Sequence, residues 1–181
     1  MIRIRPRGVA MLLATAVVPL VVSLGASAAA AAGPNAGFGF NARDVAGFPT
    51  GGVVLTGGGA FNSSTGFVHA GGSFTCASQV SQGPLAGCLT GEGVRWDTAD
   101  LLSGTTFKCT GLASEALKPA STDHDTAVLH ADFYRAGDGI DESFTANMIV
   151  SAGDIALDIP GLQNVWVQGV GCATALVHFS S

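Results

Sequence analysis

Charged side chains are scarce in this sequence. Only 12% of its 181 residues are charged, with 13 acidic and eight basic side chains, whereas 48% are hydrophobic. This composition excludes a disordered acidic or basic tail, which combines high net charge with few apolar residues. The shortage of lysine and arginine excludes a nucleic-acid binder, because such a protein needs a basic face.

The common signatures of catalysis and cofactor binding are also lacking. The chain has no C-x-x-C pair for a zinc site and, after residue 32, no G-x-S-x-G around a serine nucleophile. Neither Gly51-Gly52 nor Gly57-Gly58-Gly59 is followed by Lys-Ser/Thr and a helical pattern, so both predict tight turns rather than a phosphate-binding loop. These patterns indicate no catalytic residue, no metal ligand and no cofactor.

Long apolar runs are limited to the start of the chain. A run from Val9 to Leu24 follows three arginines and precedes a small-residue segment that ends in Ala30-Ala31-Ala32. This order is typical of a cleaved secretory signal peptide over residues 1–32, with cleavage after Ala30 or Ala28 as an alternative. The run of 16 residues is shorter than the roughly 20 that span a bilayer, which disfavours an uncleaved anchor. We therefore expect a secreted protein whose single domain covers residues 33–181 and has no membrane span.

Removal of that segment would make the protein more acidic. Five of the eight basic side chains would remain against 13 acidic ones, a formal net charge of −8. Such a surface favours solubility and repels nucleic acid and anionic lipid.

The four cysteines predict two disulfides. All four follow the predicted signal peptide, and an even number of cysteines in an exported protein is typical of a disulfide framework. The four are Cys76, Cys88, Cys109 and Cys172. One pairing joins Cys76 to Cys88 across a short loop and Cys109 to Cys172 across distant strands. A rival pairing joins Cys76 to Cys109, because both follow a phenylalanine at strand spacing. We favour the first pairing, and each bridge would stabilise the domain by roughly 2–4 kcal/mol.

The hydrophobic periodicity predicts an all-β fold. Phe144, Ala146, Met148 and Val150 alternate with polar residues, and only Ile149 interrupts the polar face. One apolar and one polar face is typical of antiparallel strands. The alternation repeats in segments that we predict as strands near 37–42, 52–57, 66–76, 92–97, 104–110, 126–135, 143–151, 163–170 and 172–179. We expect a single antiparallel barrel or sandwich of about eight or nine strands.

Turns and the one helical segment complete this prediction. Glycine-rich turns are predicted at Gly57-Gly58-Gly59, Gly83-Pro84, Gly137-Asp138-Gly139 and Pro160-Gly161, and Asn62-Ser63-Ser64 is interpreted as a turn rather than a glycosylation site. Two similar segments, Gly58–Phe61 and Gly71–Phe74, predict the arms of one hairpin. Residues 113–118 predict one or two helical turns before Pro119.

Two groups of titratable residues are candidates for a site. His130 and Asp132 share one strand face, and such a pair can orient a general base. Residues 138–142 gather three carboxylates, Asp138, Asp141 and Glu142, that could bind calcium or act on a sugar. His124 lies between two aspartates without further ligands at metal-site spacing. For each, a hydrogen-bonded or solvated surface group is the favoured interpretation.

Three segments carry a resemblance to other proteins. They are Gly91–Trp96, Ala131–Gly139 and Gln163–Cys172, and together with the Ala/Gly/Val-rich start they resemble uncharacterised exported proteins of actinomycete bacteria. The resemblance implies a bacterial exported protein and carries over no activity and no catalytic residue.

Three functions remain after these exclusions. We favour a non-catalytic extracellular or envelope-associated binding module, with a protein or a cell-wall component as partner, because loops on a disulfide-bonded scaffold commonly carry binding sites. The first alternative is a barrel that carries a small apolar ligand, with space near Ala131, Ala146, Ala173 and Ala175. The second alternative is a barrel-fold cyclase or hydrolase that uses His130, Asp132 or the acidic segment.

Overall fold

A computed structural model describes residues 33–137 and 141–181 and contains eleven strands and no helix in those ranges. The strands are β1 (Ala36–Gly47), β2 (Gly52–Asn62), β3 (Phe67–Ser78), β4 (Arg95–Leu102), β5 (Gly104–Phe107), β6 (Lys118–Ser121), β7 (Thr126–Tyr134), β8 (Phe144–Ser151), β9 (Val165–Val167), β10 (Gly171–Ala173) and β11 (Leu176–Ser180). The predicted all-β fold is therefore confirmed. The signal peptide predicted at residues 1–32 lies outside the described residues, and so does part of the turn predicted at residues 137–139.

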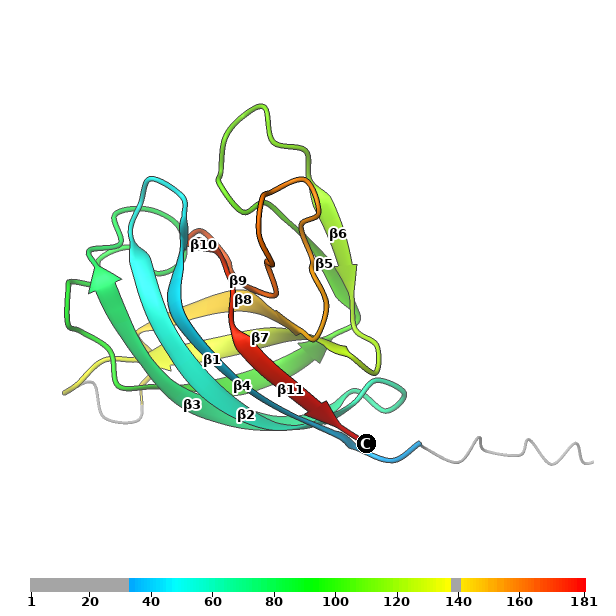
Figure 1. Cartoon of the computed structure of the whole chain (residues 1–181). Helices are drawn as coiled ribbons and strands as arrows, with labels where there is room; N and C mark the ends of the chain where they lie inside the picture. Colours follow the sequence, from blue (N-terminus) through cyan, green and yellow to red (C-terminus); the bar gives the residue numbers. More distant parts are fainter. Residues whose placement is uncertain (1–32, 138–140) are drawn as a thin grey trace, which may run out of the picture. The chain divides into compact units, whose positions relative to one another are not determined.

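Eight of the strands form a closed antiparallel ring (Figure 1). The order is β1-β2-β3-β4-β7-β8-β9-β10, and β10 returns to pair with β1 at Ala46↔Cys172 and Gly47↔Gly171. β11 continues beyond β10 and pairs with the other half of β1, from Gly37↔Ser180 to Asn41↔Leu176. Closure of the ring leaves few free sheet edges, which is how barrels avoid edge-to-edge association.

The inward faces of these strands form one packed core. Leu129, Ala131 and Phe133 of β7 are fully buried, and the polar residues between them face outward, as the periodicity predicts. β8 repeats the pattern with Ala146, Met148 and Val150. Burial of alternate side chains provides the main driving force for closing the sheet into a barrel.

Gly57 makes room for Trp96, the largest core side chain. The tract Gly57-Gly58-Gly59, predicted as a turn, lies instead within β2 and pairs with β1 and β3, so that prediction is wrong. A Cβ atom added at Gly57 would lie 2.6 Å from Cζ2 of the Trp96 indole. Gly72 is the β3 partner of Gly57 and also the neighbour of Trp96 on β4. The indole Nε1 of Trp96 donates a hydrogen bond to the carbonyl of Thr56 at 3.0 Å. Glycine is present here for space across the sheet, and not for a change of chain direction.

A second layer covers part of the barrel from outside. β5 and β6 form a separate two-stranded sheet, and Phe107 of this hairpin packs against Trp166, with ring centroids 5.6 Å apart. Val128, Ile149 and Trp166 are barrel residues that point outward into this second cluster. The contact explains why Ile149 interrupts the polar face of β8.

The second layer also accounts for the wrong helix prediction. Residues 113–115 form a turn, β6 begins at Lys118, and Pro119 of β6 pairs with Thr106 at the edge of a short sheet. Proline is tolerated there because one side of an edge strand needs no backbone donor. The glycine-rich hairpin, by contrast, is as predicted, with Gly57↔Gly72 and Gly58↔Gly71 paired in β2 and β3. No helix in the described part of the chain is long and apolar enough to cross a membrane.

Candidate outer groove at the barrel seam

Two disulfides fix the barrel and its outer layer. Cys76 pairs with Cys88, and Cys109 pairs with Cys172, as the favoured prediction has it. The second bridge connects the end of the β5 segment to β10, at the point where β10 closes the ring against β1. Two disulfides fit a protein of an oxidising, extracellular compartment.

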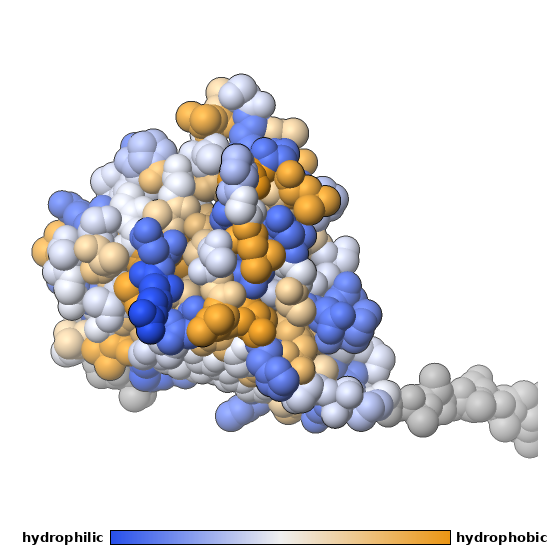
Figure 2. Space-filling view, viewed as in Figure 1, coloured by the Kyte–Doolittle hydropathy of each residue, from blue (hydrophilic) through white to orange (hydrophobic). Residues whose placement is uncertain are grey.

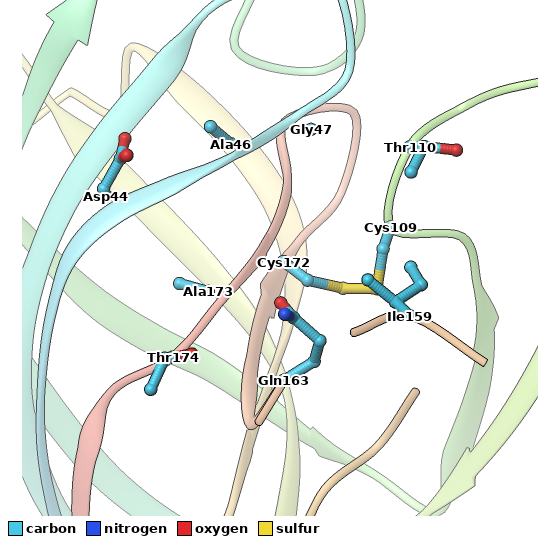
Figure 3. A pocket seen from close by; sticks show the side chains of 10 residues that line it. All are labelled: Asp44, Ala46, Gly47, Cys109, Thr110, Ile159, Gln163, Cys172, Ala173 and Thr174. Carbon is cyan, nitrogen blue, oxygen red and sulfur yellow. A yellow bond between two sulfur atoms is a disulfide. The ribbon is translucent and has the colours of Figure 1, made fainter. Parts of the chain in front are cut away.

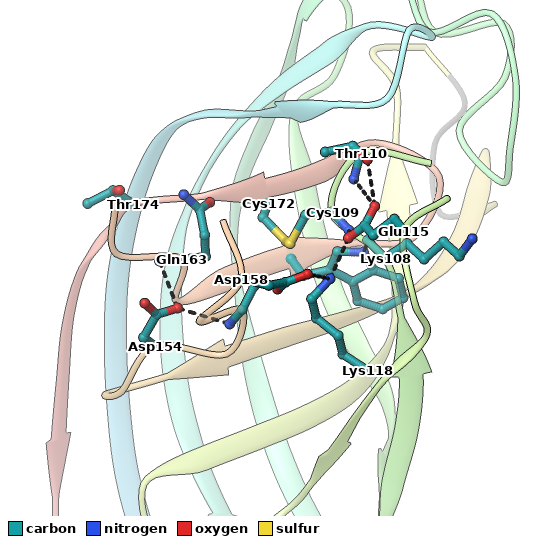
Figure 4. Close-up of a disulfide and its surroundings, with 12 residues drawn as sticks. Lys108, Cys109, Thr110, Glu115, Lys118, Asp154, Asp158, Gln163, Cys172 and Thr174 are labelled. Atoms are coloured by element: carbon teal, nitrogen blue, oxygen red, sulfur yellow. Dashed lines mark hydrogen bonds and ion pairs between the residues drawn. A yellow bond between two sulfur atoms is a disulfide. The ribbon is translucent and has the colours of Figure 1, made fainter. Parts of the chain in front are cut away.

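An ion-pair network with a buried centre at Glu115 and Lys118 reinforces the same connection (Figure 4). The carboxylate of Glu115 accepts hydrogen bonds from the backbone N–H groups of Cys109 and Thr110, from the Thr110 hydroxyl and from Nζ of Lys118. Lys118 also contacts Asp158 at 3.1 Å, which links the outer hairpin to residues 152–164. The two segments are therefore held to each other and to the barrel.

The network changes the acidity of both buried groups. Burial by itself would raise the pKa of Glu115, but the hydrogen bonds from Lys118, Thr110 and the two backbone N–H groups outweigh it and lower the pKa to about 2. For Lys118, burial would lower the pKa, and the contacts with Glu115 and Asp158 raise it above its ordinary value instead. Both groups are therefore charged over the whole neutral range.

A hollow of about 440 Å³ lies on the outside of the barrel, beside the Cys109–Cys172 bridge (Figure 3). We call this hollow the outer groove. β1 forms one wall, β10 and Thr174 form the floor, and the other wall comes from Thr110, Ile159 and Gln163. The lining mixes carboxylate, hydroxyl, amide and apolar groups, so the groove can make both directed hydrogen bonds and apolar contacts.

The strand pairing has a gap next to this groove. β1 is irregular between Ala42 and Val45, and the last strand is interrupted at Thr174-Ala175, so the β1 pairing to β10 and to β11 is not continuous. The buried side chain of Asn164 closes the gap from inside, since it donates to the carbonyl of Ala175 and accepts from the Ala175 N–H. The interruption divides the predicted strand 172–179 into β10 and β11.

The barrel interior is filled by large side chains. Phe38 contacts Phe61 and Phe179 with ring centroids 5.9 Å apart in each case, and Phe40 lies 5.9 Å from Trp96. The small residues that were candidates for lining an empty interior are buried within this core; they are Ala131, Ala146, Ala173 and Ala175. These alanines belong to the same continuous buried cluster as the aromatic rings, and this packing gives no support to an internal ligand.

His130 and Asp132 are not joined by a hydrogen bond. His130 contacts the Asn147 side chain instead, with its Nδ1 2.8 Å from Oδ1. Burial and the nearby carboxylates of Glu142, Asp97 and Asp100 raise the pKa of Asp132, while His130 acts in the opposite direction. Both side chains lie on the outward face of β7. Within residues 33–137 and 141–181, neither of them is hydrogen-bonded to a serine, threonine or cysteine that could act as a nucleophile. This arrangement supports a surface polar cluster.

The other sequence candidates lie on exposed loops or within turns. His124 is 86% exposed and pairs with Asp125. Asp141 and Glu142 are exposed, whereas Asp138 lies outside the described residues, so the acidic segment is not described as a unit. The Asn62 side chain is buried and accepts hydrogen bonds from Ser64 and Thr65, which confirms the turn at this position. Within the ranges 33–137 and 141–181, no group of three or more His, Cys, Asp or Glu side chains is placed to hold a metal ion.

No protein-family model matches the chain, and no curated protein or solved structure is significantly similar to it. Its function must therefore be inferred from its own geometry.

Sequence reasoning identified the Cys109–Cys172 bridge beside the groove but missed the polar residues that hold the surrounding segments in place. Glu115 is part of a segment with helical composition, which concealed its role as a hydrogen-bond acceptor for Cys109 and Thr110. Gln163 and Asn164 were predicted only as the start of a strand near 163–170 and as part of a resemblance, with no role in a site. A buried asparagine that bonds a backbone eleven residues away leaves no local pattern that could have revealed it.

Proposed function

We propose that this protein is a secreted, non-catalytic binding module of the extracellular space or cell envelope, and that its ligand occupies the outer groove. The observation that carries the proposal is the contrast between a filled barrel interior and an open hollow of about 440 Å³ on the barrel surface. That volume is within the range of roughly 300–1,000 Å³ typical of ligand sites.

The groove has the rigidity that a binding site needs. Its outer wall is held by the Cys109–Cys172 disulfide, by the bonds around Glu115 and by the Trp166 indole, which donates to the Lys108 carbonyl at 2.8 Å. A preformed wall reduces the conformational entropy that is lost when a ligand binds. The two disulfides and the leader expected at residues 1–32 support an extracellular location.

The proposal is tested by mapping ligands onto backbone amides. The ¹⁵N-labelled protein is titrated with a library of short peptides and cell-wall oligosaccharides, and amide shifts are recorded. Shifts should cluster at Gly47, Thr110, Gln163 and Thr174, which line the groove. Shifts centred on the Trp96 indole N–H would favour the apolar-ligand carrier instead.

A groove-filling variant and a matched control test the same site by mutation. Thr174→Trp places a large side chain at an exposed position of the groove and should abolish binding. Thr65→Trp makes the same change at an exposed position of the Asn62–Gly66 turn and should leave binding unchanged. If Thr174→Trp retains full affinity for every ligand found, the groove is not the binding site.

A further inference from the structure

The gap in the strand pairing contains a second, smaller hollow. It measures about 190 Å³ and is lined by Asn41, Arg43, Thr174, Ala175 and Leu176. Thr174 also lines the outer groove, so the two hollows adjoin. A ligand in the outer groove can therefore extend one of its ends into this smaller hollow.

Arg43 supplies a guanidinium without a carboxylate partner among the described residues. Arg95 pairs with Asp97, Arg135 with Glu92, and Lys118 with Glu115 and Asp158. Lys108 donates to a backbone carbonyl. Arg43 is exposed beside the hollow and has no such contact, in a chain whose formal net charge is −5. An unpaired guanidinium is a strong, planar binding group for a carboxylate.

Asn41 supplies an unused acceptor two residues away. Its Oδ1 atom is buried and receives no hydrogen bond within the described part of the molecule. Buried polar atoms are nearly always paired, so an orphan of this kind at a hollow points to a missing donor. The Cα atoms of alternate strand residues are about 7 Å apart, a distance that the backbone N–H and the carboxylate of one C-terminal residue can bridge with a hydrogen bond at each end.

Leu176 adds an apolar contact at the same place. It is the cross-strand neighbour of Asn41 and is 81% exposed, an unusual state for a leucine at the start of a strand. Apolar surface is visible over the beginning of β11 and over residues 152–164 on the same face (Figure 2). A ligand that reaches Asn41 and Arg43 would cover part of this surface.

We infer that the hollow at Arg43 binds the free carboxyl terminus of a polypeptide whose last side chain is apolar. This inference rests on the outer groove being the binding site. A C-terminal residue carries a carboxylate for Arg43, a backbone N–H for Asn41 and a side chain for Leu176, all within one residue. A neutral sugar lacks the charge, and sulfate lacks the donor. The preceding residues of the peptide would run past Thr174 into the outer groove.

The test compares one peptide in two chemical forms. Acetyl-Gly-Ala-Ala-Leu with a free carboxylate and the same peptide as its C-terminal amide are titrated into the protein by calorimetry. The free acid should bind about tenfold more tightly than the amide, because a charged hydrogen bond is lost in the amide. Arg43→Gln should abolish this difference, Arg43→Lys should retain part of it, and Asn41→Leu should weaken binding of both forms.

Controls separate failure of this inference from failure of the proposed function. Arg95→Gln removes an arginine elsewhere on the barrel and should leave the tenfold preference intact, and circular dichroism checks the fold of each variant. Equal affinity for acid and amide, persistence of the preference in Arg43→Gln, or no binding of either peptide would overturn the inference. If the two forms bind equally but Thr174→Trp abolishes binding, the groove stands and only the carboxylate assignment fails. If Thr174→Trp leaves binding intact, the proposed site fails as well.

Discussion

At the residue scale, Glu115 illustrates how a single carboxylate can organise a loop. Its side chain is 6% exposed, yet it stays ionised because four donors surround it. Burial without those donors would make the charge costly. The Glu115 carboxylate therefore depends on the conformation of residues 108–118 for its donors, and the hydrogen bonds that it accepts stabilise that conformation in turn.

Stability should depend on the protonation of Glu115. The folded-state pKa of about 2 is below the ordinary value of 4.5, so this carboxylate stabilises the fold above pH 4.5 and loses that contribution as the pH falls towards 2. Glu115→Gln should lower the free energy of unfolding by about 1–3 kcal/mol at pH 6 and flatten the acid decline. Urea denaturation at pH 6 and pH 3 measures both effects. An acid decline as steep in the variant as in the parent would contradict this role.

Gly57 is a second position at which a single added carbon atom should change the stability of the fold. In Gly57→Ala the new Cβ would lie 2.6 Å from the Trp96 ring and 2.5 Å from the Gly71 carbonyl oxygen. We expect a loss of about 1–3 kcal/mol in unfolding free energy from overpacking, with a changed Trp fluorescence spectrum. Gly153→Ala is the control, because a Cβ there meets only Ser151 Oγ at 4.0 Å. Equal stability of the two variants would mean that the barrel wall adjusts freely around Trp96.

At the scale of elements, the outer hairpin depends on its connections to the barrel. β5 and β6 pair only with each other among the described strands, and a two-stranded sheet is marginal in water. Phe107, the Trp166 indole and the Cys109–Cys172 bridge supply the stability that the hairpin lacks. The wall of the outer groove is therefore only as rigid as these contacts.

The two disulfides should differ in their effects. Cys109–Cys172 spans 63 residues and Cys76–Cys88 spans 12, so loop entropy assigns them about 4 and about 3 kcal/mol. Replacing both cysteines of a pair by serine should cost more for the longer bridge. Amide exchange should also accelerate over residues 104–121 and 152–164 in that variant alone. Unchanged exchange over these residues would show that the ion-pair network suffices to hold the layer.

At the scale of the whole molecule, the barrel interior is packed and the hollow of about 440 Å³ lies outside it. The ring closes through β10, and the interior holds a continuous set of aromatic side chains. The chain is acidic overall, with a formal net charge of −5, and a net charge away from zero favours solubility. Arg43 is exceptional against that background, since the other arginines in the described ranges all contact carboxylates.

Export and oxidation can be checked together on the intact protein. Native mass spectrometry of culture medium should give a chain that begins near Gly33 and is four hydrogen atoms lighter than its reduced form, as expected for a cleaved leader and two disulfides. A mass that includes residues 1–32 would contradict cleavage. Additional mass that leaves on denaturation would identify a bound ligand directly.

The sequence by itself determined the fold class, because alternation such as Leu129, Ala131 and Phe133 forces one face of each strand inward. It also determined the glycine-rich hairpin and favoured the observed disulfide pairing, since both follow from local spacing. The tertiary structure alone decided that Gly57-Gly58-Gly59 is a strand, because its reason is the Trp96 ring across the sheet. The tertiary structure alone also decided which residues lie together at the candidate site. Asn41 and Arg43 lie on β1, Thr174 follows β10 and Gln163 lies before β9, and these segments line adjoining hollows because β10 closes the ring against β1.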